Sequence, residues 1–310
     1  MYQDFYGLQS LPFELTADPA FLFLGPRQQE VLSNLEYGLC AAKGLTVLTG
    51  EPGTGKTTLL RAALESDRCR HVISVCITNP VLTRDEFLAT LASGFNISAD
   101  RPSKAMLLEA LERELRNRRA RGIVTALVID EAQALPTELL EEIRLLGNVE
   151  SATEKLLPLV LVGQTELAVR LETPSLRQLK QRIALRCETP ALTLQETAAY
   201  IAGRIARAGG RPAALFTQEA VAMIHQSSRG IARTIGVICD NALVTGLALD
   251  RKPVDRAIIA DVCRDFCLPA SEPIVTRPFG AVPHPQHGMN VPSALQPHDQ
   301  RALGTRERQS

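Results

Sequence analysis

The chain has 310 residues, of which 45% are hydrophobic and 22% are charged, so it is long enough for two domains with ordinary cores. Thirty-four basic residues balance thirty-four acidic ones, so the net charge does not favour nucleic acid or an anionic membrane as a partner. The sequence shows no signal peptide and no run near the roughly 18 apolar residues of a spanning helix. We therefore expect a soluble, cytoplasmic protein.

Short apolar runs rich in β-branched residues predict strands that are buried on both faces of a parallel sheet. They cover residues 45–50, 71–77, 123–130, 157–163 and 183–189. Amphipathic segments between them predict crossover helices, as at 103–122, where Ser103 is the expected N-cap. The pattern predicts an α/β domain over residues 1–191, with an N-terminal segment at 1–35.

The remaining sequence divides into two regions of different character. From Thr193 to Leu268 the periodicity is helical, and turn signals such as Gly209-Gly210 separate the segments, so a small helical lid domain is predicted over 192–268. From Pro269 onward Pro, Gln, Ser and His dominate without periodicity. Such a composition buries too little apolar surface to offset chain entropy, so we expect a disordered tail over 269–310.

A glycine-rich loop follows the first predicted strand. It matches the phosphate-binding pattern G-x-x-x-x-G-K-[ST] at every fixed position. Its glycines let backbone N–H groups turn around a phosphate, and the next helix presents the positive end of its dipole. Lys56 is expected to contact the β- and γ-phosphates of ATP, and Thr57 to bind Mg²⁺. The predicted nucleotide-binding residues are Gly50, Glu51, Pro52, Gly53, Thr54, Gly55, Lys56, Thr57 and Thr58.

Two acidic residues end the strand predicted at 123–130. Asp130 at the carboxyl end of a strand beside the phosphate loop is placed to hold Mg²⁺ through water. The adjacent Glu131 is placed to act as the general base on an attacking water. The pair is what distinguishes a site for hydrolysis from one that only binds a nucleotide.

Two later residues fit the same site. Gln164 follows the strand predicted at 157–163, where its amide is expected near the γ-phosphate or the attacking water. Arg233 opens a predicted lid helix, and its guanidinium could fold back onto the phosphates. Each residue type is common on protein surfaces, so their order behind the first two motifs carries the prediction.

A basic segment, 175–188, contains Arg177, Arg182 and Arg186. An arginine supplied to the ATP of a neighbouring subunit would stabilise transition-state charge and couple hydrolysis to assembly. We predict Arg182 in this role, with Arg177 as the next candidate. The alternative is a basic helix face that docks on an acidic surface.

The motifs together resemble those of AAA+ ATPases of the general secretion pathway protein A (ExeA-like) group. The resemblance spans roughly residues 1–268 and is carried by TGEPGTGKTTL, VIDEAQ, KLLPLVLVGQTEL, LRQLKQRIALR and SRGIARTIGVICDNAL. It implies a P-loop NTPase (AAA+) parallel sheet with flanking helices, followed by a helical lid. It also implies that Gln164 is sensor 1, Arg233 sensor 2 and Arg182 the arginine finger, with Phe13 near the nucleobase.

The predicted activity is hydrolysis of ATP to ADP and phosphate with Mg²⁺, in a homo-oligomer that remodels or positions a protein partner. The resemblance leaves the partner open among secretion, exopolysaccharide export and transposition systems. A second hypothesis is an ATP-dependent DNA-binding regulator similar to the ATPases that select transposition targets. The basic run at 113–121 motivates it.

Overall fold

The computed structural model describes residues 2–14, 22–78, 80–97, 104–151 and 154–268, all of which belong to one compact unit, Met1–Ser271. The predicted N-cap Ser103 and the predicted tail at 269–310 lie outside the described residues. No described helix is both long enough and apolar enough to cross a membrane.

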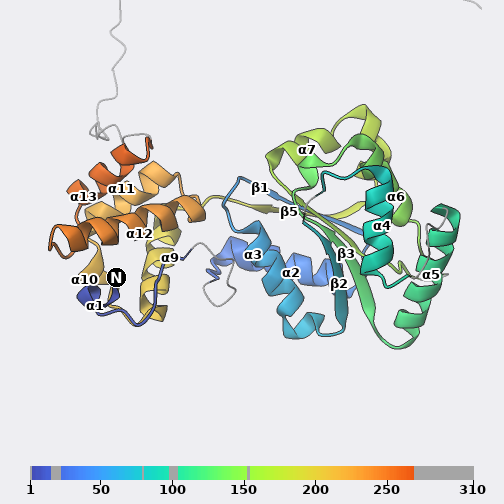
Figure 1. Cartoon of the computed structure of the whole chain (residues 1–310), viewed down its shortest axis with the longest axis horizontal. Helices are drawn as coiled ribbons and strands as arrows, with labels where there is room; N and C mark the ends of the chain where they lie inside the picture. The colour runs from blue at the N-terminus through green and yellow to red at the C-terminus, as the bar shows by residue number, and fades with distance from the viewer. Residues whose placement is uncertain (1, 15–21, 79, 98–103, 152–153, 269–310) are drawn as a thin grey trace, which may run out of the picture. The chain divides into compact units, whose positions relative to one another are not determined.

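A five-stranded parallel sheet forms the centre of the α/β region, in the order β2-β3-β4-β1-β5 (Figure 1). The predicted fold class is confirmed, and every predicted strand is present. The strands are β1 (Leu45–Gly50), β2 (Val72–Ile77), β3 (Val124–Ile129), β4 (Leu159–Gly163) and β5 (Ile183–Thr189). Since β3, β4 and β1 are neighbours and parallel, the loops that follow them meet at one edge of the sheet.

Helices cover both faces of this sheet (Figure 1). On β3, Ala126 and Val128 face one apolar cluster, whereas Leu127 and Ile129 face the other, because successive side chains of a strand alternate. The first cluster is closed by α2 (Pro26–Cys40) and α3 (Lys56–Glu65). The second is closed by α4 (Arg84–Gly94), α5 (Lys104–Ala120), α6 (Thr137–Leu146), α7 (Thr165–Leu171) and α8 (Arg177–Lys180).

A third apolar cluster belongs to the helical region. Its helices are α9 (Leu194–Arg207), α10 (Pro212–Leu215), α11 (Gln218–Ser228), α12 (Ala232–Ala248) and α13 (Arg256–Asp265). Thr193 caps α9 through a capping box with Glu196. The short α10 was not predicted.

The N-terminal residues pack into the helical region. Tyr2 and Tyr6, at either end of α1 (Gln3–Tyr6), belong to its core together with Leu8 and Phe13. We propose that residues 2–13 form part of the helical lid and not of the α/β domain. The division at 191/192 stays a prediction.

The lid is joined to the phosphate loop by a backbone contact. Arg233 N, in the first turn of α12, donates to Gly53 O at 3.0 Å. A Cβ on Gly53 would lie 2.8 Å from the Cβ of Arg233, so a side chain at Gly53 would separate the two segments. Glycine is required there for this close approach as well as for its φ of +82°.

Candidate nucleotide-binding site

The loop between β1 and α3 surrounds a buried lysine. Lys56 Nζ donates to Gly50 O and Glu51 O, each at 2.9 Å. Its side chain is only 8% exposed. Burial lowers the pKa of Lys56, because it disfavours the charged form. The nearby carboxylates of Glu131 and Asp130 raise this pKa and so partly offset the effect of burial. The lysine is therefore held by carbonyl oxygens that a phosphate can replace.

A hydroxyl and a carboxylate meet beside this lysine. Thr57 Oγ1 donates to Asp130 Oδ2 at 2.9 Å, and Asp130 is 9% exposed. Both side chains offer hard oxygen ligands, the type that Mg²⁺ prefers. Mg²⁺ usually binds few protein ligands, and substrate phosphates and water molecules complete its coordination. The described residues contain no larger cluster of metal-binding side chains. The Thr57–Asp130 pair thus fits a magnesium ion shared with a nucleotide.

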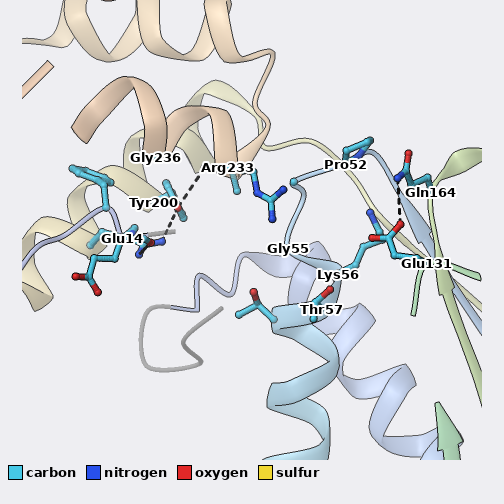
Figure 2. A pocket seen from close by; sticks show the side chains of 15 residues that line it. Glu14, Pro52, Gly55, Lys56, Thr57, Glu131, Gln164, Tyr200, Arg233 and Gly236 are labelled. Atoms are coloured by element: carbon cyan, nitrogen blue, oxygen red, sulfur yellow. Dashed lines mark hydrogen bonds between the residues drawn. The ribbon is translucent and has the colours of Figure 1, made fainter. Parts of the chain in front are cut away.

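Glu131 and Gln164 contact each other, although they follow different strands. Gln164 Nε2 donates to Glu131 Oε2 at 3.3 Å (Figure 2). Glu131 is exposed and adopts a φ of +54°, a left-handed conformation that is rare outside glycine. Its backbone N–H donates to Asp130 Oδ1 at 2.9 Å, which fixes this turn. The structure therefore brings Asp130, Glu131 and Gln164 together, as predicted from their strand ends.

Gln133 is a neighbour of this group that was not predicted. Its Nε2 donates to Glu131 Oε2 at 2.5 Å, and its Oε1 accepts from Gln164 N at 3.0 Å. It lies in the short helical turn Ala132–Ala134 directly after Glu131. The only sequence signal was its place within VIDEAQ, where a polar residue in a turn is unremarkable.

The lid and the loops line a common cavity of about 240 Å³. Arg233 from α12 faces the same space as Lys56, Glu131 and Gln164 (Figure 2). The other lining residues include Phe13, Glu14, Pro52, Gly53, Gly55, Thr57, Thr58, Tyr200, Arg204 and Gly236. The cavity thus joins the predicted phosphate-binding residues to the lid.

Arg204 of α9 connects the lid to the N-terminal segment at this cavity. Its Nε donates to Pro12 O at 2.5 Å and its Nη2 to Glu14 O at 3.2 Å. Its Nη1 donates to the Tyr200 hydroxyl at 2.8 Å (Figure 2). Phe13, between these carbonyls, is 2% exposed and lines this cavity, and its place near the nucleobase stays a prediction. Neither Tyr200 nor Arg204 carried a sequence signal.

A smaller cavity of about 80 Å³ continues the first one past Gly55 and Thr58. Its walls are more apolar, because Leu22, Phe23, Leu59 and Leu192 contribute to them. Small-molecule sites commonly combine apolar walls with few polar groups. This second cavity has the character expected for the nucleoside end of a ligand whose phosphates lie in the first.

Arg182 lies at the opposite edge of the sheet. It directly precedes β5, and its Nη1 donates to Gly147 O at 3.5 Å. It lines a separate cavity of about 150 Å³ with Lys43, Arg144 and Lys155, next to the first residues of β1 and β4. The length of β1, roughly 16 Å at 3.3 Å per residue, separates this edge from the phosphate loop. Arg182 is thus too far to contact a nucleotide bound to its own chain.

Arg186 and part of the basic run have local partners. Arg186, within β5, pairs with Glu172 at 3.3 Å. On α5, Arg116 pairs with Glu112 at 2.6 Å, Arg118 pairs with Glu114 at 2.7 Å, and Arg119 pairs with Glu154. Three of the five arginines of the basic run are therefore partly neutralised, and DNA binding by this run stays a prediction.

Comparison with known sequences identifies one domain family and a homologous protein. Residues 40–171 match the AAA domain family. Over 249 residues the chain is 39% identical to general secretion pathway protein A of Aeromonas hydrophila. The aligned residues make up 80% of this chain and 45% of that protein. The chain therefore spans less than half the length of this curated relative.

Solved structures show the same fold at low sequence identity. Cdc6p from Pyrobaculum aerophilum has a TM-score of 0.61 at 20% identity, over 80% of this chain and 70% of that chain. The ORC2 protein of Aeropyrum pernix, in a structure of its ADPNP–ADP complexes, has a TM-score of 0.62 at 16% identity, over 84% of this chain and 72% of that chain. At these identities the likeness concerns the fold alone.

Proposed function

This chain contains an AAA domain and is a homologue of general secretion pathway protein A, and from that premise we propose that it binds ATP with Mg²⁺ and hydrolyses it. One observation carries the proposal. Lys56, the Thr57–Asp130 pair and the Glu131–Gln164 pair, which follow three neighbouring strands, converge at one edge of the sheet. Binding alone would need no carboxylate beyond the one that faces the metal.

The loop residues would hold the phosphates. Lys56 exchanges its bonds to Gly50 O and Glu51 O for bonds to the β- and γ-phosphate oxygens. Thr57 and Asp130 are the residues that would hold Mg²⁺, which neutralises phosphate charge when bound. Arg233, fixed to the loop through Gly53, supplies a further positive charge from the lid.

Glu131 would then act as the general base. As the oxygen of a water molecule bonds to the γ-phosphorus, Glu131 accepts a proton from that water. The bond between the γ-phosphorus and the bridging oxygen breaks, and its electron pair leaves with ADP. The proton passes from Glu131 to phosphate or solvent, so the carboxylate is restored. Gln164 is close enough to Glu131 to orient the same water.

Completion of the site in a homo-oligomer is part of the proposal. Arg182 has no access to its own phosphate loop, so we assign its charge to the nucleotide of a neighbouring copy. Hydrolysis would then respond to assembly, and the cycle would remodel or position a protein partner. The homologue's name points to a partner in a secretion system.

The test is release of phosphate from Mg²⁺-ATP by the purified chain, alongside ADP binding measured by calorimetry. We expect Lys56→Ala to abolish both nucleotide binding and turnover. Glu131→Gln should retain ADP affinity and lose on the order of a thousandfold in turnover, the range of a general base. Lys43→Ala, at the opposite edge, should retain ADP affinity. Undiminished hydrolysis by Glu131→Gln would refute the assignment of the base.

A further inference from the structure

The Oε1 of Gln133 lies against Gly163, the last residue of β4. A Cβ on Gly163 would approach that oxygen to 2.8 Å. Arg170 Nη1, from α7, donates to Gln133 O at 2.5 Å. Gln133 is therefore held at two points: its half-buried side chain lies against β4, and its backbone carbonyl is bonded to α7.

Both amide donors at this site meet the same carboxylate oxygen. Gln133 Nε2 and Gln164 Nε2 donate to Glu131 Oε2, at 2.5 and 3.3 Å. Among the described residues no hydrogen bond reaches Glu131 Oε1. A carboxylate with one oxygen held has a fixed rotation, and its second oxygen remains available for a proton.

The backbone of Glu131 adds to this constraint. Its φ of +54° is a costly conformation for a residue with a side chain, of a kind that persists where its surroundings over-determine it. Asp130 Oδ1 holds the backbone N–H, and Gln133 holds the side chain two residues later. The strained turn and the amide together define where the carboxylate lies.

We propose that Gln133 is a positioning residue for hydrolysis, which orients Glu131 so that Oε1 faces the attacking water and which ties Glu131 to the backbone of Gln164. The inference rests on the proposed ATPase function. Gln133 acts through Glu131 and Gln164 and has no direct role in holding the phosphates, since it does not line the cavity. Its loss should therefore lower turnover and leave nucleotide affinity unchanged.

The experiment compares Gln133→Met and Gln133→Glu with the wild-type chain. Methionine keeps the approximate volume and removes both hydrogen bonds, whereas glutamate keeps an acceptor for Gln164 N but replaces the donor to Glu131 with a second carboxylate. We expect kcat to fall on the order of 10- to 100-fold in each variant, as for a misplaced catalytic group. ADP affinity should stay within about twofold of wild type.

A second pair of variants shows whether the effect passes through Glu131. Single-turnover hydrolysis of radiolabelled ATP is measured for Glu131→Gln with and without Gln133→Met. If Gln133 positions Glu131, the second change adds no loss, because residues that act as a unit are not additive. An equal further loss in the Glu131→Gln background would overturn the inference.

The controls separate this inference from the proposed function. Gln29→Met, an exposed glutamine in the first turns of α2, should retain wild-type kcat. A wild-type chain without Mg²⁺-dependent turnover would refute the ATPase proposal itself. Turnover by the wild type that Gln133→Met and Gln133→Glu both preserve would refute only the role of Gln133.

Discussion

The two edges of the central sheet differ in the groups that they present. At the carboxyl edge of β1, β3 and β4, Lys56 is bonded to loop carbonyls and Thr57 to Asp130, beside a cavity. At the amino edge of β1 and β4, Arg182 shares a cavity with Lys43, Arg144 and Lys155. In the proposed function the first edge holds the nucleotide and activates water, and the second supplies a cation to a neighbouring copy. The charge that stabilises the transition state would then be divided between two ends of one sheet, and hydrolysis would depend on assembly of copies.

At the amino edge, substitution of Arg182 should have the largest effect. Arg182→Ala is expected to lower kcat on the order of a thousandfold, the lower range for an arginine finger, with ADP affinity unchanged. Steady-state phosphate release and calorimetry give the two quantities. Arg186→Ala is the matched control, because Arg186 lies within β5, the strand that Arg182 precedes, but pairs with Glu172. A larger loss in Arg177→Ala than in Arg182→Ala would transfer the finger to Arg177.

Mixing two inactive variants tests whether the edges belong to different copies. Lys56→Ala lacks the carboxyl-edge lysine and Arg182→Ala lacks the amino-edge arginine, so a mixed oligomer contains some interfaces with both residues intact. We expect equal mixtures to recover about a quarter of wild-type turnover if pairing is random. Mixtures without any recovery would contradict action in trans.

Alanine substitution of two glycines with similar backbone conformations, one at each edge, should have a more moderate effect. Gly53 has a φ of +82° and contacts Arg233, whereas Gly44, at the amino edge, has a φ of +89° and open space around its Cα. Each change to alanine should cost about 1 kcal/mol of stability through the left-handed backbone. Only Gly53→Ala should also weaken ADP, by about tenfold, because the lid is displaced. Equal ADP affinities in the two variants would contradict a lid contribution.

The smallest expected effect is the uptake of a proton by Lys56 when ADP binds. Burial lowers the pKa of Lys56 below its ordinary 10.5, and phosphate anions raise it again because they favour the charged form. ADP binding at alkaline pH should therefore take up a fraction of a proton, and affinity should fall as pH rises through the lowered pKa. Calorimetry in buffers of different ionisation enthalpy measures the uptake. Lys56→Arg should abolish it, and proton release by the wild type would contradict the sign.

The sequence predicted the centre of the sheet well because β3, β4 and β1 are buried on both faces and so appear as continuous apolar runs; the outer strands β2 and β5 are partly exposed. It missed α10, whose four residues, Pro212–Leu215, are too few for a helical period. It assigned residues 1–35 to the α/β domain and gave no sign that Tyr2 and Phe13 pack against helices more than 180 residues later, the contact on which our proposal for residues 2–13 rests. Contacts at that separation leave no local pattern.

The candidate site likewise contains residues that the sequence predicted and a residue that it missed. Lys56, Thr57 and Asp130 were predicted because a short motif or a strand end fixes each of them. Gln133 was missed because its importance depends on Gln164, which follows another strand, and on Gly163, which leaves room for its amide. Arg182 was assigned a role from the basic segment 175–188 and the family resemblance, and the structure adds the distance that separates it from its own phosphate loop.

Because Arg233 N donates to Gly53 O, the first turn of α12 is fixed to the phosphate loop. The helix has 17 residues and is about 25 Å long, so a tilt of about 5° about its first turn moves its far end by about 2 Å. Tyr2 would move with α12, because its hydroxyl donates to Asp240 Oδ1 at 2.5 Å, so a small displacement of the loop would become a larger movement of the helix and reach the first residues of the chain.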